Sequence, residues 1–97
     1  MKLLVTGGSR GIGKAIAKEA AKAGHDLILV SRNSANLEQG YDDVKSVAKS
    51  TVQKFVCDVG DKTQLEKLYE HCQNSGFMPD VLVLSAGIFF EDTTLIK

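Results

Sequence analysis

The sequence has 97 residues, 43% of them hydrophobic and 25% charged, and its 12 basic residues balance its 12 acidic ones. This length and composition predict one small globular domain over residues 1–97 and argue against intrinsic disorder. The balanced charge, without a basic stripe, argues against a nucleic-acid partner. Apolar runs as short as residues 27–30 and 81–84 argue against a membrane partner, because neither could span a bilayer.

Apolar runs alternate with helical patterns along the chain, without long gaps between them. Continuous apolar runs are typical of strands buried on both faces, as in a parallel sheet. Gly24 and Gly76 are predicted to end the first and third helices, and Asp61-x-x-Gln64 predicts a capping box at the start of the third. The predicted elements are strand 2–6, helix 12–23, strand 26–31, helix 35–49, strand 51–57, a helix that Gly76 closes and strand 81–84, and the tail from residue 87 has no clear period. This alternation predicts an α/β fold, with a parallel sheet, right-handed crossovers and helices on its faces.

The most informative motif runs from Val5 to Gly13 and reads Val-Thr-Gly-Gly-Ser-Arg-Gly-Ile-Gly. A predicted strand leads into it and a predicted helix leads out of it, which is the context that a dinucleotide-binding loop requires. Gly7 suits the sharp turn after the strand, Gly11 a close approach of the backbone to a pyrophosphate, and Gly13 tight packing of the helix on the sheet. The free N–H groups at the helix N-terminus favour phosphates, so the motif predicts a dinucleotide ligand.

The spacing of this motif, Thr-Gly-x-x-x-Gly-x-Gly, resembles that of the short-chain dehydrogenase/reductase family. Three further segments resemble the family, so that the resemblance covers essentially the whole chain: Ser31-Arg32-Asn33, Cys57-Asp58-Val59 and Leu84-Ser85-Ala86-Gly87. Ser85 departs from the family's usual asparagine. The resemblance implies a Rossmann-like three-layer αβα fold with a short parallel sheet in the order 3-2-1-4, truncated to a partial dinucleotide-binding domain. It also implies the cofactor-binding residues Gly7, Ser9, Arg10, Gly11, Ile12, Gly13, Ser31, Arg32, Asp58, Val59, Ser85, Ala86 and Gly87.

The end of the second strand, where the family reads the adenosine ribose, predicts which cofactor binds. A dehydrogenase that uses NAD usually carries a carboxylate there, which would repel a 2′-phosphate. This chain instead carries Ser31 and Arg32, and a second arginine, Arg10, lies in the glycine loop. Two guanidinium groups suit a phosphate dianion, so the sequence predicts NADP(H) rather than NAD(H). The same arginines argue against S-adenosylmethionine, which carries no phosphate.

The chain lacks the residues that the family uses for hydride transfer. That step needs a tyrosine, a lysine four residues later and a serine, on a fifth strand and helix that would lie beyond residue 97. Tyr41 and Lys45 have this tyrosine–lysine spacing, but they lie on the second helix, and Tyr41 falls on its apolar stripe. We therefore expect Tyr41 to be core-facing or half-buried, and we predict that the chain has no catalytic residue and is inactive alone.

Two functions of different classes remain open. The first is the NADP(H)-binding portion of an oxidoreductase acting on a carbonyl or secondary alcohol, with a small-molecule substrate only in a full-length form. The second is a truncated, non-catalytic module that binds nucleotide or self-associates without turnover. The fourth strand would lie at an edge of the expected sheet, so we also predict either a homo-oligomer formed through that edge or loss of order there.

The two cysteines and two histidines of the chain predict no metal site. Cys57 and Cys72 belong to no Cys-x-x-Cys pair and are expected to be buried and reduced, which together with the lack of a signal-peptide pattern predicts a cytoplasmic protein. His25 and His71 are isolated, with no set of metal ligands around either. Surface or capping roles are expected for both.

Overall fold

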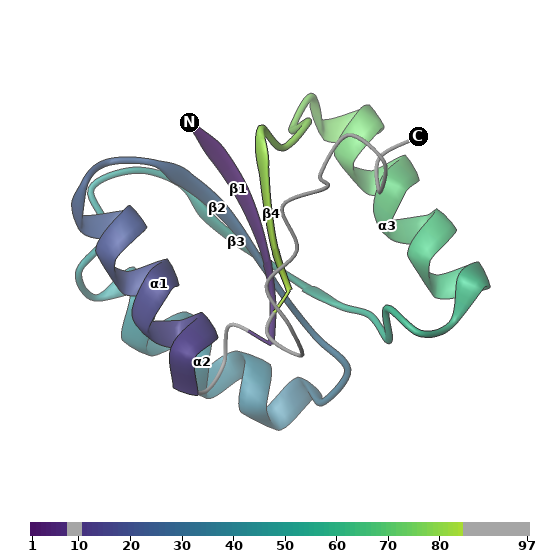
Figure 1. The fold of residues 1–97 in the computed structure, drawn as a ribbon, viewed down its shortest axis with the longest axis horizontal. Coiled ribbons are helices and arrows are strands. Elements are labelled where there is room, and N and C mark those ends of the chain that lie inside the picture. The colour runs from purple at the N-terminus through teal and green to yellow at the C-terminus, as the bar shows by residue number, and fades with distance from the viewer. Residues whose placement is uncertain (8–10, 85–97) are drawn as a thin grey trace.

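The computed structural model describes residues 1–7 and 11–84, which form a four-stranded parallel sheet with helices on both faces (Figure 1). The strands lie in the order β3-β2-β1-β4, and all neighbouring pairs are parallel. The predicted α/β fold and strand order are confirmed. The chain runs through β1 (Lys2–Thr6), α1 (Gly11–Lys22), β2 (Asp26–Ser31), α2 (Ser34–Lys45), β3 (Val52–Val56), α3 (Lys62–Ser75) and β4 (Val81–Leu84).

The helices divide between the two faces of the sheet, with α1 and α2 on one face and α3 on the other (Figure 1). Right-handed crossovers produce this division. The chain steps in one direction from β1 to β2 to β3, and then returns across the sheet to β4. The third helix must therefore cross on the opposite face, where it stands alone among the described helices.

Strand β2 carries the centre of the core because helices cover both of its faces. Leu27 and Leu29 belong to the cluster on the α1–α2 side, Ile28 and Val30 belong to the cluster on the α3 side, and all four are fully buried. Burial of one such side chain contributes about 1.5–3 kcal/mol. This double burial explains why the run is continuously apolar rather than alternating.

Helix α2 ends at Lys45, so the predicted extent to residue 49 was wrong. The N–H groups of Val47 and Ala48 donate to carbonyls three residues back, which tightens the chain out of the α-helix. The N–H of Lys49 then donates to the carbonyl of Ala21 in α1, at 3.1 Å. A contact with another helix, invisible to the local pattern, therefore fixes the path of the chain after α2.

An ion pair joins the two helices on this face. The Lys14 ammonium of α1 lies 2.8 Å from the Asp43 carboxylate of α2, and both side chains are partly exposed. The hydrogen bond and the charge of Lys14 hold the pKa of Asp43 below its ordinary value of 3.8. The pair therefore stabilises the contact between α1 and α2 when Asp43 is ionised.

Candidate functional site

The four strands end at one edge of the sheet, and the three helices begin there (Figure 1). In open α/β sheets, ligands bind outside the carboxyl ends of the strands, where the strand order reverses. Here that reversal lies at β1, which has β2 on one side and β4 on the other. The first turns of α1 and α2 contain no acidic residue, so the N-termini of these two helices present a positive potential to this edge, whereas the Asp61 carboxylate caps the N-terminus of α3.

The glycine turn leads from β1 to α1 at this edge. Gly7 has a φ of 66°, and its N–H donates to the carbonyl of Val30 at 2.8 Å, which ties the turn to β2. Helix α1 begins at Gly11, and Gly13 is buried in its first turn. The predicted cofactor contacts that fall outside the described residues are those of Ser9, Arg10, Ser85, Ala86 and Gly87, and the cofactor-binding roles of all these residues stay predictions. The same holds for Ile12, whose side chain is not described.

The end of β2 presents a cation to the same edge. The Ser31 hydroxyl accepts a hydrogen bond from the Asn33 N–H at 3.2 Å, and the Asn33 side chain accepts from the N–H of Asn36, which caps α2. Arg32 lies between these two residues, is exposed, and forms no salt bridge within residues 1–7 and 11–84. Among the residues that the structure describes, no ion pair competes for Arg32, and its predicted contact with a 2′-phosphate, like that of Ser31, stays a prediction.

The loop after β3 places a carboxylate and an apolar side chain at the edge. Three groups of Asp58 are held by neighbours: its N–H donates to the Gln64 side chain at 2.8 Å, its carbonyl accepts from the Asp61 N–H at 2.9 Å, and Oδ1 accepts from the Gly60 N–H at 2.9 Å. Within the described ranges no hydrogen bond reaches Oδ2. Val59 follows with 42% of its surface exposed.

The capping box predicted at Asp61 and Gln64 is only half formed. The Asp61 side chain accepts from the N–H groups of Thr63 and Gln64, as predicted. Gln64, however, reaches past Asp61 and accepts from the N–H of Asp58. Sequence reasoning assigned Gln64 only to the helix cap, and so missed its contact with the loop. A glutamine side chain three residues after the N-cap is long enough to reach either the N–H of the cap residue or the N–H of Asp58, and the fold of the loop selects Asp58.

The Tyr-x-x-x-Lys spacing in α2 lies away from this edge. Tyr41 is half-buried and packs against the core on the α1–α2 side, so its predicted environment is confirmed. Its hydroxyl accepts a hydrogen bond from Lys45 at 3.0 Å, and the Lys54 ammonium of β3 lies 4.6 Å from the ring centroid. The tyrosine is therefore held in a cation–π contact at the outer edge of the sheet.

Cys57 and Cys72 are free and buried, as predicted. Burial raises the pKa of both thiols, and the charges of Asp58 and Asp61 raise that of Cys57 further. His71 packs against Phe55, with 5.0 Å between ring centroids, and lies within hydrogen-bond distance of Gln53. Among the described residues, no group of three side chains could hold a metal ion, and no helix is long and apolar enough to cross a membrane.

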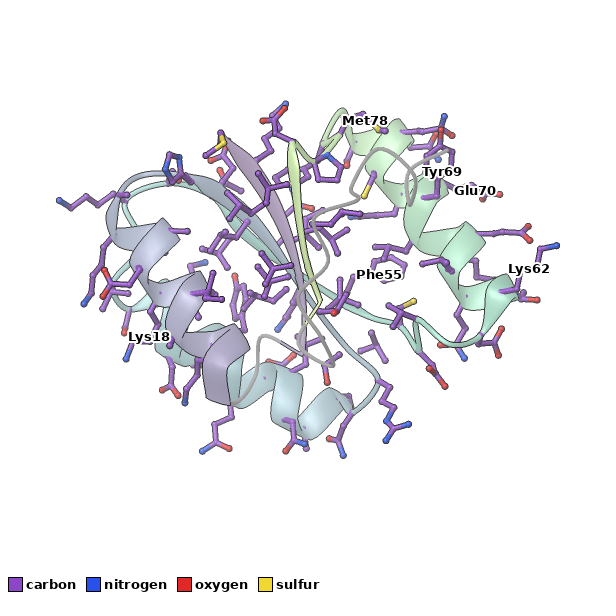
Figure 2. The ribbon with its side chains drawn as sticks, viewed as in Figure 1. Lys18, Phe55, Lys62, Tyr69, Glu70 and Met78 are labelled. Carbon is purple, nitrogen blue, oxygen red and sulfur yellow. The ribbon has the colours of Figure 1, made fainter. Side chains whose placement is uncertain are left out.

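A cavity of about 280 Å³ lies on the α3 face, between α3 and strands β1 and β4. Its lining is largely apolar and runs from Thr6 and Val59 near the carboxyl edge to Met78 and Pro79 before β4. Figure 2 shows Tyr69 of α3 and Met78 near this second end. Because its walls carry few polar groups, the cavity does not fit a pyrophosphate, and the carboxyl edge is the better candidate for a ligand that carries phosphates.

Comparison with known proteins gives the same assignment as the geometry. Residues 2–96 match the family described as short chain dehydrogenase. The sequence is 37% identical over 86 residues to the uncharacterized oxidoreductase DltE of Bacillus subtilis, covering 89% of this chain and 32% of that protein. It is 43% identical over 70 residues to a tropinone reductase homolog of Arabidopsis thaliana, covering 72% of this chain and 21% of that protein.

Solved structures have the same fold. The L-sorbose reductase of Gluconobacter frateurii, solved with NADPH and L-sorbose, matches with a TM-score of 0.76 and 30% identity, over 84% of this chain and 31% of that one. RhlG of Pseudomonas aeruginosa, solved with NADP, matches with a TM-score of 0.76 and 25% identity, over 87% of this chain and 33% of that one. The chain thus spans about a third or less of the length of these proteins. It belongs to the short-chain dehydrogenase family and corresponds to the nucleotide-binding region of that fold.

Proposed function

We propose that this chain is the NADP(H)-binding portion of a short-chain oxidoreductase that acts on a carbonyl or a secondary alcohol. The observation that carries the proposal is Arg32, an exposed guanidinium at the carboxyl end of β2. No acidic residue lies at this strand end or in the first turn of α2, so nothing there would repel a 2′-phosphate. The L-sorbose reductase solved with NADPH and RhlG solved with NADP are similar in fold, which supports the same cofactor here.

The residues at the carboxyl edge fit this cofactor. The turn at Gly7 and the start of α1 would hold the pyrophosphate, since that helix N-terminus offers N–H groups without a competing carboxylate. Ser31 and Arg32 would hold the phosphorylated ribose, and Asp58 and Val59 the adenine. When bound, the nicotinamide supplies the hydride chemistry of the family, and the residues of this chain bind and orient the molecule.

In this proposal, the residues that select the substrate belong to the part of the fold that this chain does not span. The matching region is 32% of DltE and 31% of the L-sorbose reductase. Because Tyr41 and Lys45 lie on α2 and away from the carboxyl edge, they do not supply the family's acid–base pair. We therefore expect the 97-residue chain to bind NADP(H) without turning over a substrate. The two free, buried thiols favour a cytoplasmic location.

A fluorescence titration with NADPH and NADH tests the cofactor proposal. Arg32→Asp should weaken NADPH binding by about 10- to 100-fold, because a hydrogen bond to a charged group contributes about 1.5–3 kcal/mol, and it should leave NADH binding nearly unchanged. Lys67→Asp makes the same charge change at an exposed site on α3 and is the matched control. An equal loss for both nucleotides in Arg32→Asp would contradict the assignment of the 2′-phosphate to this residue.

A second candidate function is a self-associating module without turnover. The apolar cavity beside β4 favours it, because Leu65, Tyr69 and Met78 each expose 40% or more of their surface there. This candidate predicts self-association of the chain that does not depend on nucleotide.

A further inference from the structure

Gln64 links the first turn of α3 to the loop that follows β3. Its Oε1 accepts from the N–H of Asp58 at 2.8 Å, and its Nε2 donates to the Asp61 carboxylate at 3.4 Å. The side chain is partly buried, and the two contacts use both ends of its amide. Gln64 therefore fixes where the backbone of Asp58 lies relative to the helix.

The contacts around Asp58 leave one of its oxygens for a ligand. The Gly60 N–H holds Oδ1 at 2.9 Å, while Oδ2 receives no hydrogen bond from the residues that the structure describes. The next side chain, Val59, is 42% exposed. An acceptor oxygen that meets no donor among the described residues, beside an exposed apolar side chain, complements a flat ring that carries an amine, such as a 6-aminopurine.

We propose that Gln64 is a positioning residue for base recognition: by holding the backbone of Asp58, it sets where Oδ2 can meet the exocyclic amine of an adenine bound as in the proposed function. Through this contact the site would select adenine over a purine that lacks the amine. The inference rests on the proposed function, because it assumes that the adenine end of a dinucleotide binds at this loop. Nothing in it depends on Arg32, which acts on the other end of the adenosine.

Titrations with NADPH and with its hypoxanthine analogue, in which a carbonyl replaces the adenine amine, test this inference. The unchanged chain should bind NADPH about tenfold more tightly, because the analogue would place an oxygen against Asp58. Gln64→Leu removes the acceptor and should reduce this ratio to about threefold or less, with little change for the analogue. Gln64→Glu keeps an acceptor oxygen for the Asp58 N–H but loses the donor to the Asp61 carboxylate, so it should restore the ratio only in part.

Two further variants separate positioning from stability. Gln73→Leu makes the same change at an exposed position near the other end of α3 and should leave the ratio unaltered. Gly60→Ala would place a Cβ 3.3 Å from Oδ1 of Asp58, so it should displace the carboxylate and lower the ratio even if Gln64→Leu does not fold.

The outcomes are distinct for the inference and for the proposed function. An unchanged ratio in folded Gln64→Leu, or equal binding of both nucleotides by the unchanged chain, would overturn the inference and leave the cofactor assignment intact. Binding of neither nucleotide by the unchanged chain would overturn the proposed function, and this inference with it. A lowered ratio in Gln64→Leu that is restored in part in Gln64→Glu supports a positioning role.

Discussion

Gly7 and Gly76 offer a matched pair of substitutions, because both have a left-handed backbone and only Gly7 lies at the candidate site. Their φ values are 66° and 73°. For an alanine this conformation costs about 1–2 kcal/mol, and the lower entropy of its unfolded chain offsets about 0.4–1 kcal/mol of that. An added Cβ at Gly76 would meet no atom within 4 Å, so backbone strain is the dominant effect there. Through backbone strain alone, each alanine variant should lower the free energy of unfolding by about 1 kcal/mol.

Urea denaturation followed by circular dichroism measures this loss. With a slope of about 1–3 kcal/mol per molar urea, the midpoint should fall by about 0.3–1 M in both variants. Gly76→Asn should lose less, because asparagine tolerates the left-handed region better than alanine does. NADPH titration should then distinguish the two variants. In Gly7→Ala the altered turn would move the pyrophosphate loop, so the affinity for NADPH should be weaker by about tenfold or more. In Gly76→Ala the affinity for NADPH should be unchanged.

Two results would refute this reasoning. Equal weakening of NADPH binding in both alanine variants would mean that stability, rather than the turn at Gly7, controls affinity. An unchanged urea midpoint in Gly76→Ala would mean that the left-handed C-cap of α3 carries no strain for an ordinary residue.

The ion pair between Lys14 and Asp43 predicts a dependence of stability on pH. Because the pKa of Asp43 is lowered in the folded chain, the stabilisation from its ionised carboxylate is complete above the ordinary pKa of 3.8 and is lost as the pH falls and the carboxylate is protonated. When the pH is lowered from 5 into the acid range, the urea midpoint of Lys14→Met should therefore fall less than that of the unchanged chain. An equal fall of the midpoint in both proteins would count against the ion pair. Strand β4 has a sheet neighbour on one side only within residues 1–7 and 11–84, and this edge and the adjoining cavity predict concentration-dependent self-association, measured by sedimentation. Leu65→Glu and Tyr69→Glu should both reduce it, whereas a monomer at all concentrations would argue against this surface as an interface.

Much of the fold could be predicted because its signals are local or follow general rules. The continuous run 27–30 predicts a strand covered on both faces, and Leu27 to Val30 are all fully buried. Gly76 ends α3 where it was expected, with a left-handed φ. The end of α2 was predicted four residues too late, because the bond from Lys49 to Ala21 joins residues that are distant in the sequence.

In the candidate site, too, some features could be predicted from the sequence and others could not. The glycine spacing and the exposed Arg32 are readable from the sequence, since each depends on residue type and on position relative to a strand. Tyr41 was predicted to be core-facing or half-buried from its place on an apolar stripe, which the structure confirms. The partner of Gln64 was not predictable, because a cap and a bridge to the preceding loop require the same residue at the same position.

The sequence by itself determined the order of elements, the strand order that right-handed crossovers and the family spacing imply, and the residue types at the carboxyl edge. The order of elements follows from periodicity, which acts over short stretches, whereas the strand order and the roles at the carboxyl edge are what the family resemblance implies. The tertiary structure decided where α2 ends, which oxygen of Asp58 is left free, and which loop Gln64 holds. Those features depend on hydrogen bonds whose partners are chosen only when separate segments have packed together.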